Sequence, residues 1–183
     1  MNKDDKHNGV ALIVIDIQMG LFERANPIYE ADQFLKNVNT LIQDARQGGV
    51  PVIFIQHANE NTLVRGSHEW QLHPEIQPLE GEIIIHKLEG DAFIDTELKD
   101  ELEKRDVNCL VVTGLLTQQC VKETSLGALK RGYRVYLVSD GHSNFSKDAE
   151  RLIKKWNQTI SKKGAELVET KAVDFRRVGS GGE

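Results

Sequence analysis

Short apolar runs alternate with amphipathic segments along this chain, and this alternation restricts its fold more than any other feature. Residues 10–16, with the sequence VALIVID, form a continuous apolar run that ends in a carboxylate. Such a run is typical of a strand buried on both faces of a parallel sheet. Similar runs predict further strands at residues 51–55, 82–86, 107–113 and 134–139, with a short edge strand at 166–168.

Apolar residues at helical spacing separate most of these strands. They predict helices at residues 30–47, 96–105, 119–130 and 147–163. Strands that alternate with helices form βαβ units with right-handed crossovers, and the helices then cover both faces of the sheet. We therefore expect a Rossmann-like, three-layer α/β/α fold with a central, mainly parallel sheet.

The length of the chain suits a single domain. Its 183 residues suffice to bury one sizeable core. We predict this domain over residues 1–177 and a flexible, glycine-rich tail over 178–183. The long polar stretch at 56–81 is expected to be a loop with functional content.

The charge and hydropathy of the chain exclude several classes of partner. A net charge of −5 and a pI near 5.7 indicate no basic surface for nucleic acid. The N-terminus is polar, and no apolar run is long enough to span a bilayer. We expect a cytoplasmic protein that binds a small molecule and has no nucleic-acid or membrane partner. Its two cysteines are then expected to be reduced thiols.

Three chemically active side chains follow predicted strands. Asp16 follows the first strand, Lys87 the third, and Cys120 lies beyond the fourth at the expected start of a helix. Taken singly, Asp16 has a structural explanation as a turn residue, and Lys87 as an exposed lysine. Ligands of parallel sheets bind at the carboxyl ends of the strands, where these residues lie. A lysine there would favour both a carboxylate and a thiolate, so we predict one active site.

Cys120 is the predicted nucleophile of this site. Free amides and the dipole at a helix start stabilise an anion, so we expect a lowered thiol pKa. The glycine-bearing turn at 114–117 places further amides beside the thiol, as an oxyanion hole requires. Cys109 lies inside the strand at 107–113 and is predicted to be a small buried hydrophobe.

Sequence motifs for nucleotides and metals are not evident. No G-x-G-x-x-G follows the first strand, and no G-x-x-x-x-G-K-[ST] occurs. The segment Asp16-Ile17-Gln18 lacks the second carboxylate that magnesium chemistry favours. The loop at 56–81 contains neither a close histidine pair nor an Asp-x-His cluster, so we predict no metal and no cofactor. The histidines considered are His57, His68, His73 and His86.

Three motifs occur in a specific order along nearly the whole chain. They are LIVIDIQ at 12–18, a lysine at 87 followed by DAF at 91–93 and T-x-L at 96–98, and VVTGLLTQQCVKET at 111–124. In this order they resemble the isochorismatase-like cysteine hydrolases. That family also includes nicotinamidases, N-carbamoylsarcosine amidase-like enzymes and streptothricin hydrolase-like proteins.

The resemblance implies a catalytic triad formed by Asp16, Lys87 and Cys120. It also implies a non-proline cis peptide bond between Leu115 and Leu116. The amides of Leu116 and Cys120 would form the oxyanion hole, and the protein would be a homo-oligomer, either a dimer or a tetramer.

Departures from the family pattern narrow the expected chemistry. Members that hold zinc or iron for nicotinamide carry Asp-x-His after the second strand, whereas this chain reads QHAN at 56–59. Nicotinamidase activity is therefore disfavoured. Isochorismatase itself hydrolyses a vinyl ether, which needs no cysteine nucleophile, so the presence of Cys120 favours amide chemistry. The segments at 66–74 and 140–143 look closest to the streptothricin hydrolase-like branch.

The predicted function is hydrolysis of a C–N bond in a small amide, ureido or lactam substrate through a cysteine thioester. Gln18 and Trp70 are predicted substrate contacts, with a role as loop anchor as the alternative for Trp70. Two other functions stay open: an isochorismatase-type vinyl ether hydrolase and a non-catalytic small-molecule-binding domain. A receiver-like signalling domain would need an acidic pair after the first strand, which is not evident.

Overall fold

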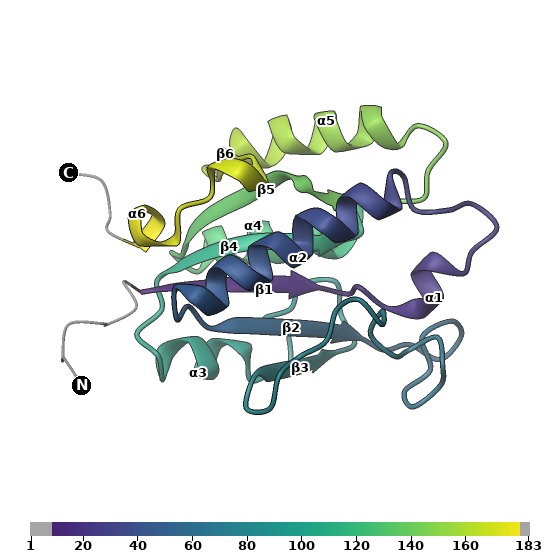
Figure 1. Ribbon diagram of the computed structural model, residues 1–183, viewed down its shortest axis with the longest axis horizontal. Coiled ribbons are helices and arrows are strands. Elements are labelled where there is room, and N and C mark those ends of the chain that lie inside the picture. The colour runs from purple at the N-terminus through teal and green to yellow at the C-terminus, as the bar shows by residue number, and fades with distance from the viewer. Residues whose placement is uncertain (1–8, 180–183) are drawn as a thin grey trace.

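Six strands form one central sheet in the order β3-β2-β1-β4-β5-β6, and neighbouring strands are parallel throughout (Figure 1). The structure, a computed structural model, describes residues 9–179. The strands are β1 (Val10–Ile15), β2 (Val52–His57), β3 (Ile83–Lys87), β4 (Cys109–Leu115), β5 (Arg134–Ser143) and β6 (Glu166–Val168). The predicted parallel sheet and its edge strand β6 are confirmed.

Helices cover both faces of this sheet, so the predicted three-layer fold is also confirmed. α2 (Ala31–Gln47) crosses one face (Figure 1), and α6 (Phe175–Gly179) packs into the same core cluster. The core on the other face includes residues of α3 (Leu98–Glu103), α4 (Lys122–Lys130) and α5 (Ala149–Ser161). The remaining helical turns are α1 (Met19–Phe22), η1 (Thr117–Val121) and η2 (Thr170–Ala172). Within the described residues, no helix is long and apolar enough to cross a membrane.

The continuous apolar run of β1 follows from its central position. All six residues of β1 are buried. Alternate residues, beginning with Val10, pack into the core beneath α2, and those beginning with Ala11 pack into the opposite core. A polar side chain on either face would lose its hydration. All six positions of β1 are therefore apolar, in contrast to the alternating apolar and polar pattern of a half-exposed strand.

Gly114 brings β4 close to the end of β1. It adopts a φ of 128°, and a Cβ atom there would lie less than 3.0 Å from the backbone N and O atoms of Ile15. The pairing of β4 with β5 also shifts register between Val112 and Gly114. Only glycine combines this backbone angle with such a close approach.

Several predicted boundaries differ from the structure, and the differences at β5 and at the tail have a clear physical reason. β5 continues to Ser143, beyond the predicted end at residue 139, because pairing with β4 resumes after the register shift and buries this polar segment. The predicted flexible tail from residue 178 begins too early, since Val178 lies in α6 and is buried in the core beneath α2. Residues 180–183 of that tail lie outside the described residues.

We expect replacement of Gly114 by alanine to destabilise the fold by about 3 kcal/mol or more, since backbone strain and overpacking add together. Gly132→Ala is the matched control, because Gly132 also has a positive φ of 87° but nothing lies within 4 Å of its Cβ position. That control should lose only about 1–2 kcal/mol from the left-handed backbone. Urea unfolding measures both, and equal losses would contradict the close-approach explanation.

Candidate active site

The carboxyl ends of three strands bring Asp16, Lys87 and Cys120 together, and we call these residues the Asp-Lys-Cys cluster. Lys87 Nζ lies 3.0 Å from Asp16 Oδ2 and 3.1 Å from Cys120 Sγ. Asp16 and Lys87 are only 2% and 1% exposed. Since β2 separates β3 from β1, the long lysine side chain reaches across the end of β2 to Asp16.

The ammonium group of Lys87 holds this cluster together. Besides Asp16 and Cys120, its Nζ contacts the Glu89 carbonyl oxygen at 3.0 Å and His57 Nδ1 at 3.3 Å. Burial is the largest influence and by itself would lower the pKa of Lys87, but the Asp16 carboxylate and the hydrogen bonds to Asp16 and Cys120 outweigh it and raise that pKa. Lys87 is therefore a cation whose hydration is replaced by protein acceptors.

The thiol of Cys120 is neutral in the free protein. Burial is the largest cause that raises its pKa to about 12; the Asp16 carboxylate adds to the rise and Lys87 opposes it. The predicted lowering of this thiol pKa by a helix start is therefore wrong. Cys120 lies in η1, where Gln119 has non-helical φ and ψ of −120° and −109°, so the helical geometry is interrupted just before the thiol.

Cys109 differs from Cys120 in its surroundings, as the sequence predicts. It is fully buried within β4 and packs in the core beneath α2. Burial raises the pKa of its thiol to about 11. Both cysteines are free thiols, and Cys120 lines a pocket of which Cys109 is not part.

The peptide bond between Leu115 and Leu116 is cis, as the resemblance implies. The carbonyl oxygen of Leu116 accepts hydrogen bonds from the amides of Gln119 and Val121 at 3.0 and 3.3 Å. Its own amide donates to no group among residues 9–179. Leu116 and Cys120 both line the same pocket, which is compatible with the expected oxyanion hole. The oxyanion hole itself stays a prediction.

A buried hydrogen-bond chain anchors the turn after the cis peptide. Thr117 Oγ1 lies 2.9 Å from His142 Nδ1 and 3.0 Å from the Ser143 carbonyl oxygen. His142 Nε2 lies 2.8 Å from Asn157 Oδ1, while the Asn157 amide nitrogen donates to the Ser139 carbonyl. Burial lowers the pKa of His142 to about 4, so its ring is neutral.

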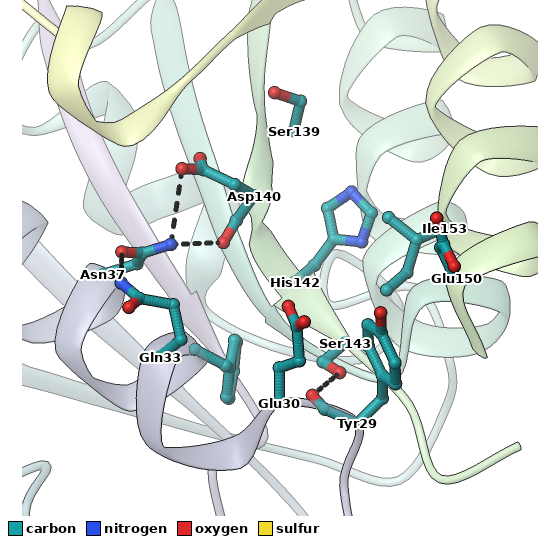
Figure 2. Close-up of a pocket in the computed structure, with 11 residues that line it drawn as sticks. Tyr29, Glu30, Gln33, Asn37, Ser139, Asp140, His142, Ser143, Glu150 and Ile153 are labelled. Carbon is teal, nitrogen blue, oxygen red and sulfur yellow. Dashed lines mark hydrogen bonds between the residues drawn. The ribbon is translucent and has the colours of Figure 1, made fainter.

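His142 also borders a second pocket, of about 510 Å³, between α2 and α5 (Figure 2). Figure 2 shows Asn37 bonded to Asp140 on one side and Ser143 bonded to the Tyr29 carbonyl on the other. No member of the Asp-Lys-Cys cluster lines this pocket. The candidate active site is therefore the smaller pocket above Cys120.

The pocket at Cys120 has a volume of about 240 Å³. Asp16 and Cys120 belong to its lining, and α1 together with the segment between β2 and β3 supplies much of the remainder. Its apolar walls are Leu21, Leu63, Leu116 and Phe145, and its other polar residues are Arg24, His57, Asn59, Thr62 and Gln119. Sequence analysis missed most of these residues, because they become neighbours only when the long loop folds over the sheet edge.

Gln18 has a structural role instead of the predicted substrate contact. Its side chain is fully buried, and Nε2 donates to the carbonyls of His57 and Trp70 at 2.9 and 2.8 Å. Its Oε1 accepts from the His57 amide at 2.9 Å. Because these bonds engage both ends of the amide, Gln18 joins the ends of β1 and β2 to the loop.

Trp70 is a loop anchor and does not line the pocket at Cys120. Its carbonyl oxygen accepts hydrogen bonds from Gln18 and Gln56, both at 2.8 Å. Its ring packs against the core beneath α2 and lies 5.1 Å from the ring of His86. These contacts support the alternative role of Trp70 as a loop anchor, and its predicted contact with substrate stays a prediction.

His57 lies at the end of β2, beside the Asp-Lys-Cys cluster, and not in the open loop. Asp16, His57 and Cys120 offer ligand atoms within 4.8 Å of one another. However, Lys87 Nζ lies 3.0–3.3 Å from an atom of each residue, so its ammonium occupies the place a metal would need. Repulsion between two cations opposes metal binding, so these residues do not fit a metal.

Comparisons with known proteins agree with this fold. A model of the isochorismatase domain matches residues 10–171. A cysteine hydrolase from Pseudomonas syringae pv. phaseolicola 1448A superimposes with a TM-score of 0.86 at 24% identity, covering 94% of this chain and 93% of its own. This structural match shows the same α/β fold. The chain belongs to the isochorismatase family.

Two curated relatives are named for the compounds on which they act. Streptothricin hydrolase from Streptomyces noursei is 35% identical over 137 residues, covering 74% of this chain and 54% of the relative. N-carbamoylsarcosine amidase from Arthrobacter sp is 27% identical over 149 residues, covering 69% of this chain and 56% of the relative. The chain therefore spans about half the length of these relatives.

Removal of the Lys87 charge should destabilise the fold. Lys87→Met leaves the Asp16 carboxylate buried without its cation, and we expect a loss of about 3–5 kcal/mol. The double variant Asp16→Asn, Lys87→Met should recover much of that loss. Lys99→Met is the control, because the exposed Lys99–Glu103 pair contributes at most about 1 kcal/mol. Urea unfolding distinguishes these cases, and an unaffected Lys87→Met protein would contradict the central role of the ammonium.

The raised pKa of Cys120 predicts slow alkylation near neutral pH. Since only the thiolate reacts, the rate of Cys120 modification by iodoacetamide should rise about tenfold per pH unit from pH 7 to 10, without a plateau. Asp16→Asn removes a charge that raises this pKa, so it should speed modification at pH 7.5 by about tenfold. Intact-mass kinetics in a Cys109→Ala background measure both. A plateau near pH 8 would contradict a neutral resting thiol.

Proposed function

We propose that the protein is a cysteine hydrolase that cleaves a C–N bond in a small amide, ureido or lactam substrate. The observation that carries this proposal is the buried Lys87 ammonium, 3.0 Å from the Asp16 carboxylate and 3.1 Å from the Cys120 thiol beside a pocket. A base, a nucleophile and a fixed cation are thereby within reach of one carbonyl group.

Asp16 is the proposed general base. An Asp16 oxygen and Cys120 Sγ lie within 4.8 Å of each other, and Asp16 Oδ1 is buried without a hydrogen-bond partner among the described residues. This oxygen is free to accept the thiol proton while Oδ2 remains paired with Lys87. Because the thiol pKa is about 12, proton transfer accompanies attack on the substrate and no thiolate accumulates beforehand.

The bond changes follow from these positions. Cys120 Sγ attacks the substrate carbonyl carbon, and the carbonyl electrons move to an oxyanion held by the amides of Leu116 and Cys120. The oxyanion then reforms the carbonyl, the C–N bond breaks, and Asp16 returns its proton to the departing nitrogen. A water molecule, deprotonated by Asp16, hydrolyses the thioester and regenerates the thiol. Lys87 keeps its charge throughout and stabilises the carboxylate of Asp16.

Two other functions make different predictions. An isochorismatase-type vinyl ether hydrolase would retain turnover without the Cys120 thiol, whereas a binding domain would bind a ligand without any turnover. The unpartnered Asp16 oxygen beside the thiol supports thiol chemistry over both.

A screen over small amides, ureido compounds and lactams tests the proposal, with streptothricin included because a relative is named for it. Ammonia release measures turnover of primary amides and ureido compounds, and mass spectrometry detects the ring-opened product of a lactam, whose nitrogen stays in the product. We expect Cys120→Ser to lower kcat by about a thousandfold or more on any substrate found. Cys109→Ala is the matched control and should retain kcat, because Cys109 lies outside the pocket. Full turnover by Cys120→Ser would exclude the thioester route, and a uniformly negative screen would favour the binding domain.

A further inference from the structure

Arg24 is an exposed residue that places an unpaired positive charge in the lining of the pocket at Cys120. Its Nε donates to the Gly20 carbonyl at 3.2 Å, and no carboxylate among the described residues forms an ion pair with it. The acidic residues nearby do not neutralise it. Glu23 is bonded to His68 at 2.8 Å. Glu69 and Arg24 both line an adjacent surface depression, but they form no ion pair with each other.

The position of this guanidinium is set by Phe145. Arg24 Cζ lies 4.9 Å from the centroid of the Phe145 ring, and both residues line the pocket. Stacking on an aromatic face orients a guanidinium and leaves its edge free to donate hydrogen bonds. With Nε directed to the Gly20 carbonyl, the two Nη groups remain available, since no hydrogen bond occupies them among residues 9–179.

The other lining residues leave this charge uncompensated. Asp16 is balanced by Lys87, and burial is the largest cause that lowers the pKa of His57, so that ring is neutral. Asn59, Thr62 and Gln119 contribute only uncharged polar groups. The pocket therefore offers a substrate one unpaired charge, and that charge is positive.

We infer that Arg24 determines specificity for small amides that carry a carboxylate, an inference that rests on the proposed function and names its substrate class. The amide carbonyl would lie at Cys120, and the carboxylate would accept hydrogen bonds from the two Nη groups of Arg24. A planar guanidinium matches a carboxylate in this way better than an ammonium does. The volume of about 240 Å³ restricts the substrate to a compact molecule, such as the monoamide of a short dicarboxylic acid.

Matched amides that differ only in charge test this inference. Succinamate and glutaramate carry a carboxylate, whereas succinamide and glutaramide carry a second neutral amide in its place. We expect the wild-type protein to hydrolyse each monoamide with a kcat/KM at least about tenfold above that of its diamide. Arg24→Ala should lower this ratio about tenfold or more, chiefly through KM for the monoamide, and Arg24→Lys should retain part of it.

Arg151→Ala is the control, because Arg151 is an exposed arginine that pairs with Asp148 and does not line the pocket. It should leave the ratio of monoamide to diamide hydrolysis unchanged. Equal use of both amides by the wild type would overturn the inference while leaving the hydrolase function intact. So would an equal loss on both amides in Arg24→Ala, since that result indicates a merely structural role.

If no amide is hydrolysed, the proposed function fails and binding decides the role of Arg24. Calorimetric titration of the wild-type protein with glutarate and with glutaramide should then show tighter binding of glutarate, lost in Arg24→Ala. Equal or weaker binding of glutarate would overturn the inference.

Discussion

The buried ammonium of Lys87 is the interaction on which the rest of this structure depends. Removing a lysine and an aspartate from water costs several kcal/mol each unless other groups replace the lost hydration. Here Asp16, Cys120, His57 and the Glu89 carbonyl surround Nζ at 3.0–3.3 Å. The groups that surround Nζ come from the ends of β1, β2 and β3 and from the turn after β4. These segments must therefore lie within reach of one lysine side chain, which constrains the strand order and the position of the loop over the sheet edge.

This arrangement also sets the chemistry available to the thiol. Many reactive cysteines are thiolates stabilised by a nearby cation. In this protein, burial and the Asp16 charge outweigh the cation, so the thiol retains its proton. Lys87 instead stabilises the ionised base, and the pair it forms with Asp16 leaves the pocket without net charge from the Asp-Lys-Cys cluster. Arg24 is then the charged lining residue that no ion pair among the described residues balances.

The segment between β2 and β3 is anchored to the sheet edge and also forms part of the pocket wall, and its polar composition indicates neither role. Gln18 and Gln56 both donate to the carbonyl of Trp70, and this fixes the loop against the sheet edge. The same loop supplies Thr62 and Leu63 to the pocket wall. A change in the loop would therefore alter pocket shape without touching the Asp-Lys-Cys cluster, which suits a fold whose relatives carry names of different hydrolases.

The sequence by itself determined the layered fold and the strand ends where Asp16, Lys87 and Cys120 lie, because hydrophobic periodicity is a local property. It also distinguished Cys109 from Cys120, since a cysteine within an apolar strand is buried wherever that strand packs. Only the tertiary structure decided the neutral thiol, the structural role of Gln18 and the extension of β5 to Ser143. A thiol pKa depends on burial and charges from distant segments, and Gln18 meets partners 39 and 52 residues away. Such contacts leave no periodic signal in the chain.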